Sequence, residues 1–147
     1  MRIVVDTNIA FSAILNTNSR IAQIILRPKT RLNFYSTDQL LAEIHEHKNK
    51  IQQLSKYSDT ELDRIIHLIT SKIRFINIHL IPKETFLKCE ALAKDVDIDD
   101  TEFVALTDHC RGRLWSGDKE LIKGLSKKQW DKFITTEELY NISKFKK

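Results

Sequence analysis

Short apolar segments alternate with helical patterns along the chain, and this alternation restricts the fold more than any other feature. The first segment, Ile3-Val4-Val5, is a continuous β-branched run that is typical of a central strand covered on both faces. Further strand-like segments lie at residues 33–36, 75–80, 113–116 and 133–134. Strands separated by helices favour a parallel sheet with right-handed crossovers. We therefore predict an α/β fold of three layers, α/β/α, with a central, mostly parallel sheet.

Helical periodicity in the first part of the chain predicts the helices that cover this sheet. Apolar side chains recur at helical spacing in residues 9–14 and 21–25, and polar residues 16–19 divide them into two helices. After strand 33–36 we predict one helix, which Thr37 or Asp38 caps. Its apolar stripe comprises Leu40, Leu41, Ile44, Ile51 and Leu54.

The second part of the chain continues the same pattern. Residues 58–61 (SDTE) predict a capping box at the start of a helix. Its buried side chains are expected to be Leu62, Ile65, Ile66, Ile69 and Ile73. Pro82 opens another helix, which residues 97–100 interrupt before the pattern resumes at 103–110. Short helices are predicted after Gly117-Asp118 and from Thr135 onward.

The length of 147 residues, with 41% hydrophobic side chains, predicts one domain over residues 1–143 and a short basic tail at 144–147 that is frayed. Only three apolar residues precede Asp6, which is too few for the core of a signal peptide, and no long apolar run follows. We therefore expect a cytoplasmic protein that does not enter the membrane.

Charge and metal-binding residue types narrow the possible functions. The net charge of +4 is compatible with a polyanionic partner. Cys89 and Cys110 match neither a disulfide framework nor a zinc motif, so we expect both to be reduced packing residues. The histidines form no zinc-binding pair on a predicted helix, and we interpret them as surface or structural residues. They are His45, His47, His67, His79 and His109.

Two carboxylates follow predicted strands directly: Asp6 after the first strand and Asp118 after strand 113–116. In an open parallel sheet the functional crevice lies beyond the carboxyl ends of the strands. The acidic segment 97–100 precedes a helix, so one of its carboxylates can point into the same crevice. Glu43 lies at the edge of an apolar helical stripe and is expected to face inward over the sheet.

Each acid also has an ordinary structural interpretation. Asp6, Asp100 and Asp118 precede helices, where Asp is a favoured N-cap, and Glu43 alone could belong to a solvated helix face. Four carboxylates gathered without cations would repel one another, whereas Mg²⁺ or Mn²⁺ requires such oxygen ligands. Two ions about 3.5–4 Å apart can activate a water and stabilise the leaving oxygen of a phosphodiester. The set together therefore predicts a metal-dependent phosphodiesterase.

Four segments, in this order along the chain, resemble the PIN-domain family. They are residues 4–8 (VVDTN), 41–44 (LAEI), 97–103 (DIDDTEF) and 116–121 (SGDKEL). The similarity spans nearly the whole chain and is greatest to the bacterial branch of toxins in toxin–antitoxin systems, to which the VapC toxins are related. The resemblance implies a metal-dependent endoribonuclease that cleaves RNA, an antitoxin protein as partner, and a homodimer.

Carried over residue by residue, the resemblance implies the members of the site. Asp6, Glu43, Asp100 and Asp118 would form the catalytic acidic centre that binds Mg²⁺ or Mn²⁺. Asp97 would be an auxiliary metal ligand, and Asp99 is a third candidate for the position given to Asp100. Residues that would contact substrate are Asn8, Ser116 and Lys119.

The sequence leaves two other functions open and disfavours a third. A structure-specific DNA nuclease would use related acids, although the chain is short for the helical arch of those enzymes. A catalytically silent binding module would use the acids to cap helices or to hold one ion. A phosphatase of the haloacid-dehalogenase type is disfavoured, because no second Asp follows Asp6 by two residues.

Basic and aromatic residues after Asp118 suggest a route for RNA. Lysines in this region could neutralise phosphates or could form an ordinary solvated face; they are Lys119, Lys123, Lys127, Lys128 and Lys132. Trp115 lies in a predicted strand and is expected in the core, so Trp130 is the better candidate for stacking on a base.

Overall fold

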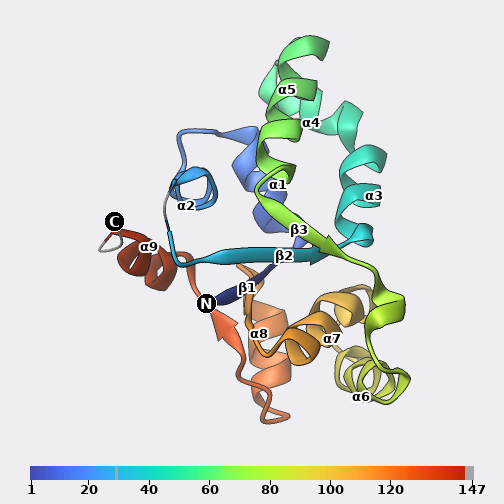
Figure 1. Cartoon of the computed structure of the whole chain (residues 1–147). Helices are drawn as coiled ribbons and strands as arrows, with labels where there is room; N and C mark the ends of the chain where they lie inside the picture. The colour runs from blue at the N-terminus through green and yellow to red at the C-terminus, as the bar shows by residue number, and fades with distance from the viewer. Residues whose placement is uncertain (29, 145–147) are drawn as a thin grey trace.

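The computed structural model describes residues 1–28 and 30–144 and confirms the predicted α/β fold. Five strands form one sheet in the order β3-β2-β1-β4-β5, and every neighbouring pair is parallel (Figure 1). The strands are β1 (Arg2–Val5), β2 (Asn33–Thr37), β3 (Ile73–Ile76), β4 (Arg113–Trp115) and β5 (Phe133–Ile134). The chain builds outward from β1 to β3 and then returns to the other side of β1. The strand order therefore reverses between β1 and β4, where open α/β sheets bind ligands.

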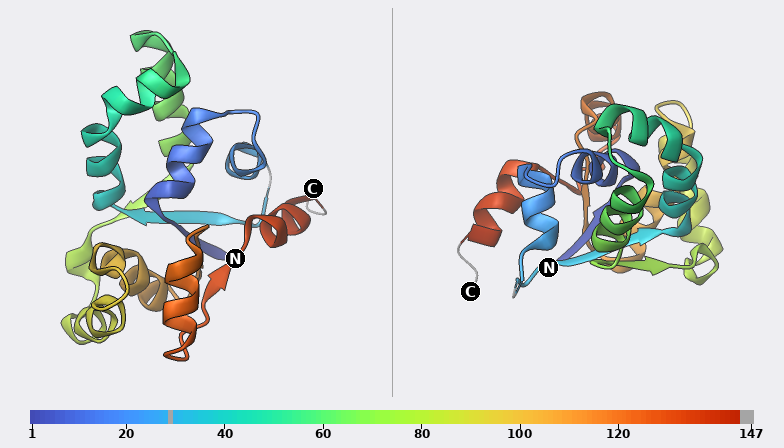
Figure 2. Two further views of the ribbon diagram at one scale, coloured as in Figure 1. Left: turned by 180° about the vertical axis from the view of Figure 1, so that it is seen from behind. Right: turned by 90° about the horizontal axis from the view of Figure 1, so that it is seen from above.

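Helices cover both faces of this sheet. In Figure 1, α1, α3, α4 and α5 lie above the sheet, whereas α6, α7 and α8 lie below it. The views in Figure 2 show α9 beside α2, and the two helices are in contact. The helices are α1 (Thr7–Leu15), α2 (Arg20–Leu26), α3 (Asp38–Glu46), α4 (Lys48–Ser55), α5 (Asp59–Thr70), α6 (Lys83–Ala93), α7 (Thr101–Cys110), α8 (Lys119–Ser126) and α9 (Thr136–Lys144), with 3₁₀ turns η1 (Ile78–Leu80) and η2 (Ile98–Asp100).

Strand β1 is the centre of the core, as its β-branched sequence predicts. Ile3, Val4 and Val5 are fully buried because helices pack on both faces of the sheet. At its carboxyl end, the Ser36 hydroxyl of β2 donates a hydrogen bond of 2.8 Å to the Val5 carbonyl. This bond ties the two central strands together next to Asp6.

The prediction of one continuous helix after β2 is wrong, because the chain forms two helices, α3 and α4, that meet at His47. The change of direction gives each helix its own apolar face. Leu40 and Ile51 are buried as expected, but Leu41 is 39% exposed and Leu54 is 64% exposed. Thr37 occupies the N-cap position of α3, yet its side chain makes no capping hydrogen bond.

The segment after α5 also differs from the expectation. The predicted capping box at Ser58 and Glu61 is present, and Leu62 and Ile69 are buried. Ile73 belongs to β3 rather than to the helix, because it pairs with Phe34 of β2. The strand ends at Ile76, and residues 78–80 form η1 rather than an extended segment.

Gly112 connects α7 to β4 and lies directly against β1. A β-carbon at this position would lie 2.5 Å from the backbone oxygen of Arg2. The residue must therefore lack a side chain for β4 to reach its place beside β1.

Both cysteines are free, with Cys89 buried and Cys110 half-buried. Within the described residues, no helix combines the length and the apolarity that crossing a bilayer requires. The last helix includes Lys144, and the rest of the predicted tail, residues 145–147, lies outside the described residues.

Candidate metal centre

A small hollow of about 160 Å³ opens at the carboxyl ends of the central strands, where the strand order reverses. Six carboxylates line it: Asp6, Glu43, Asp97, Asp99, Asp100 and Asp118. The other lining residues are Thr7, Asn8, Gln39 and Phe103. The fold thus brings every acid selected from the sequence to one place.

Asp6 follows β1 and is the most buried of these acids, with 3% of its surface exposed. Its Oδ1 accepts a hydrogen bond of 3.0 Å from the backbone nitrogen of Ile9, so it caps α1. Burial raises the pKa of Asp6 to about 6, and the nearby carboxylates of Asp118 and Glu43 contribute to the increase. The capping hydrogen bond therefore does not fully offset the cost of burying the charge of this carboxylate.

Asp118 follows β4 and caps α8 through Oδ1, which accepts hydrogen bonds from the backbone nitrogens of Glu120 and Leu121 at 3.0 and 3.1 Å. Ser116 is buried beside it, and its hydroxyl oxygen accepts a hydrogen bond of 3.1 Å from the backbone nitrogen of Asp118. The Ser116 side chain also hydrogen-bonds the Asp6 carboxylate, which lowers the pKa of Asp6. Ser116 thus connects the two acids at the strand ends.

The segment before α7 supplies three further acids. Asp97 Oδ1 accepts a hydrogen bond of 3.0 Å from the Asp99 backbone nitrogen and so holds the η2 turn. Asp100 occupies the N-cap position of α7, but its side chain makes no capping bond. Burial raises the pKa of Asp100 to about 7, with further increases from the Asp97, Asp6 and Asp118 carboxylates. The capping interpretation therefore does not account for Asp100.

Glu43 reaches the hollow from α3. The Gln39 side-chain nitrogen donates hydrogen bonds to Glu43 Oε1 at 2.7 Å and to the Asp99 backbone oxygen at 2.8 Å. Gln39 thus orients the carboxylate and joins α3 to η2. The sequence reasoning missed Gln39, although its position one helical turn before Glu43 places it on the same face.

The donor set fits a hard divalent cation. One carboxylate oxygen each from Asp97, Asp100 and Asp118 lies within 4.8 Å of the others. Carboxylate oxygens are the ligands that Mg²⁺ and Mn²⁺ prefer. Burial, with further contributions from neighbouring carboxylates, raises the pKa of Asp6 and of Asp100, and a cation in the hollow would oppose both effects. The buried Thr7 hydroxyl, which has no hydrogen-bond partner among the described residues, offers another oxygen in this lining.

The residues selected for substrate contact occupy different places. Asn8 is exposed and lines the hollow, whereas Ser116 is buried behind it. Lys119 is exposed at the start of α8, beside Asp118 but outside the lining of the hollow.

The stacking role considered for Trp130 is wrong. Trp130 is 5% exposed, packs edge-on against Phe133 and donates a hydrogen bond of 3.0 Å from Nε1 to Asp108. Trp115 is fully buried, as its strand position predicts. Four of the five histidines are exposed, and His47 is half-buried against Phe11, as expected for structural and surface residues.

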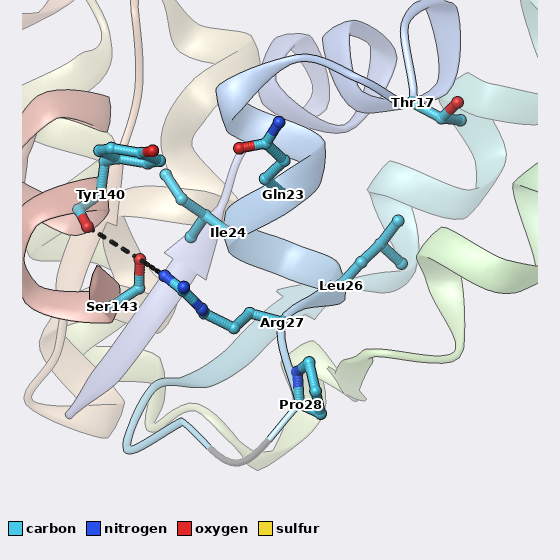
Figure 3. A pocket seen from close by; sticks show the side chains of 8 residues that line it. All are labelled: Thr17, Gln23, Ile24, Leu26, Arg27, Pro28, Tyr140 and Ser143. Carbon is cyan, nitrogen blue, oxygen red and sulfur yellow. Dashed lines mark hydrogen bonds between the residues drawn. The ribbon is translucent and has the colours of Figure 1, made fainter. Parts of the chain in front are cut away.

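A larger cavity, of about 320 Å³, lies between α2 and α9 (Figure 3). Its described lining contains no carboxylate, and Arg27 donates a hydrogen bond of 3.5 Å to Ser143 across it. This cavity therefore has a different character from the acidic hollow.

Comparison with known sequences agrees with the residue pattern. A family model described as the PIN domain matches residues 4–139, which is most of the chain. None of the curated proteins compared is significantly similar to this sequence.

Proposed function

The chain belongs to the PIN-domain family, whose members are typically metal-dependent nucleases, and on this basis we propose that the protein is a metal-dependent endoribonuclease. The observation that carries the proposal is the convergence of six carboxylates on one hollow at the reversal point of the strand order. A helix-capping role explains Asp6 and Asp118 in part but does not account for Asp100 or Glu43.

The residues divide the work at the proposed site. Asp97, Asp100 and Asp118, with Asp6 and Glu43, would hold Mg²⁺ or Mn²⁺. The chemistry that such an ion supplies is activation of a water molecule and stabilisation of the leaving oxygen of a phosphodiester.

The chain itself provides a rigid arrangement of ligands. The caps that Asp6 and Asp118 form fix Oδ1 of each carboxylate against a helix, at the lining of the hollow. The Ser116 side chain hydrogen-bonds the Asp6 carboxylate and accepts a hydrogen bond from the Asp118 backbone nitrogen, and Gln39 donates a hydrogen bond to the Glu43 carboxylate. Burial raises the pKa of Asp100 to about 7, so this carboxyl is only partly ionised near neutral pH, and a bound cation would favour its ionised form.

Cleavage of a mixed RNA pool with Mg²⁺ or Mn²⁺ tests the proposal. We expect the wild type to cleave the pool and Asp6→Asn and Asp118→Asn to lose at least about 100-fold in rate, because each change removes a charged ligand. Glu137→Gln is the control, since it removes one exposed carboxylate from α9. Full activity of both Asp variants, or of the wild type in excess EDTA, would contradict the proposal. Flap DNA offered in parallel separates a ribonuclease from a DNA nuclease.

We further propose that the enzyme acts in the cytoplasm as the homodimeric toxin of a toxin–antitoxin pair. The resemblance of its motifs to the bacterial toxin branch supports this role. Induced expression of the wild type should stop bacterial growth, whereas Asp118→Asn should not, and co-expression of the neighbouring upstream gene should restore growth. Growth arrest by Asp118→Asn as well would argue against toxicity through RNA cleavage.

A further inference from the structure

Helix α8 and its C-cap residue Lys127 present three lysines to solvent on the side opposite the buried Leu121 and Leu125. Lys119, Lys123 and Lys127 are spaced by four residues, so they form a row along the helix. Together with Ile122 and Ser126 they line a shallow hollow of about 530 Å³ on this surface. We refer to these three lysines as the lysine row.

The lysine row has no acidic partner among the residues that the structure describes. The two other lysines of this region are engaged differently. Lys128 forms an ion pair with Asp95, and Lys132 forms one of 2.6 Å with Asp108. Of the five lysines considered from the sequence, the structure thus leaves only the three of the lysine row without an ion pair among the described residues.

Part of the lysine row is unfavourable for α8 by itself, although the helix dipole favours Lys123 in the last turn. Lys119 is the first residue of the helix, where the helix dipole favours an acid. Like charges four residues apart destabilise a helix by about 0.2–0.5 kcal/mol per pair. Glu120 offers one opposite charge on this helix, but it forms no ion pair with the row. A bound polyanion would remove this repulsion.

The row begins at the proposed active site. Asp118 both lines the acidic hollow and caps α8, so Lys119 lies one residue beyond the hollow. From there the row extends for about 12 Å, the length of eight helical residues. Six carboxylates in the hollow repel a phosphate backbone, so a strand that enters needs cations near by.

We propose that the lysine row binds the backbone phosphates of single-stranded RNA on one side of the bond that is cleaved. This inference rests on the proposed ribonuclease function and assigns its substrate a path along α8 (Figure 1). Because lysines contact phosphates rather than base edges, the row adds affinity without sequence preference.

The test is binding of short fluorescein-labelled polyuridine in EDTA, which separates binding from cleavage. The variant K119Q/K123Q/K127Q is compared with K50Q/K72Q/K88Q, which removes three exposed lysines from other elements. We expect the row variant to weaken binding roughly tenfold or more and to reduce the slope of log Kd against log salt by about 2, since each lost contact with single strands contributes about 0.7. The control should retain the wild-type slope. Circular dichroism checks that both variants fold.

Several outcomes would overturn the inference: no binding of polyuridine by the wild type, a wild-type slope in the row variant, or an equal loss in the control. If the row variant loses binding to polyglutamate but not to polyuridine, the lysine row binds an acidic protein partner instead of RNA. Cleavage by the wild type in Mn²⁺ is measured separately. If the row variant loses polyuridine binding but the wild type never cleaves RNA, the ribonuclease function is wrong and the inference about the lysine row stands. If the wild type cleaves RNA but the row variant binds polyuridine as the wild type does, the ribonuclease function stands and the inference is wrong.

Discussion

The side-chain amide of Gln39 donates a hydrogen bond of 2.7 Å to Glu43, and the same nitrogen donates one of 2.8 Å to the Asp99 carbonyl. One neutral residue therefore links two walls of an acidic hollow. Loss of a residue that orients a metal ligand in this manner typically costs about 10- to 100-fold in metal affinity or activity.

Replacing Gln39 with Ala should weaken Mn²⁺ binding by about tenfold, because Glu43 loses the donor that fixes its carboxylate. Isothermal titration calorimetry measures the affinity. Gln53→Ala, on the exposed surface of α4, is the matched control and should bind as the wild type does. Equal affinity of Gln39→Ala and the wild type would show that the link is merely structural.

Replacing Asp6 with Asn should stabilise the metal-free protein, increasingly so as pH rises. The pKa of Asp6 rises from the ordinary value of 3.8 to about 6 in the folded protein, so the folded form binds the extra proton between these values. Its contribution to stability is present below pH 4 and is lost as pH rises through 6. Asn still caps α1 but carries no charge.

Urea unfolding in EDTA measures this effect. We expect Asp6→Asn to exceed the wild type by about 1–3 kcal/mol at pH 8 and by much less at pH 4.5. A difference that does not change with pH would contradict the assignment of Asp6 as a buried, uncompensated carboxylate.

Binding of Mn²⁺ should release protons near pH 6 and few at pH 8. Asp6 and Asp100 have pKa values raised to about 6 and about 7, and a cation requires the ionised forms. Affinity should therefore increase between pH 5 and 8. Calorimetry in two buffers with different ionisation enthalpies counts the protons, and Asp100→Asn should reduce the number released. An affinity independent of pH would argue against these two acids as ligands.

Replacing Gly112 with Ala should lower the free energy of unfolding by about 1–3 kcal/mol, because the new methyl group collides with the Arg2 backbone between β4 and β1. Gly117 provides the control, since a β-carbon there meets no atom within 4 Å. Thermal unfolding compares both variants. Equal melting temperatures would mean that β4 can shift without loss.

The sequence predicted the acids of the candidate site better than the residues that hold them. Asp6 and Asp118 were predictable because a β-branched run and a strand-like run end directly before them, and parallel strands end at one edge. Glu43 alone fitted a solvated helix face as well, and it was selected only together with the other acids and through the resemblance of the four segments to the PIN-domain family. Gln39 was not predictable, because its second acceptor is a backbone oxygen distant in sequence, which no side-chain pattern reveals.

The same distinction explains the errors. Trp130, in the connection between α8 and β5, is buried against Phe133 and donates its indole hydrogen to Asp108 of α7, and local sequence carries no sign of these contacts. The break between α3 and α4 at His47 contains neither Gly nor Pro, so periodicity alone extended one helix through it. Ile73 continued the helical spacing of α5, yet strand pairing with Phe34 determined its conformation.

The reversal of strand order at β1 has a consequence for folding. Asp6 and Glu43 come from the part of the chain that builds β1 and β2, whereas Asp97, Asp100 and Asp118 arrive with α7 and β4. The mutual repulsion of the acids opposes the docking of these two parts. A divalent ion bound between the two parts would stabilise their docked arrangement, so the stability of the folded domain would increase with the concentration of the ion.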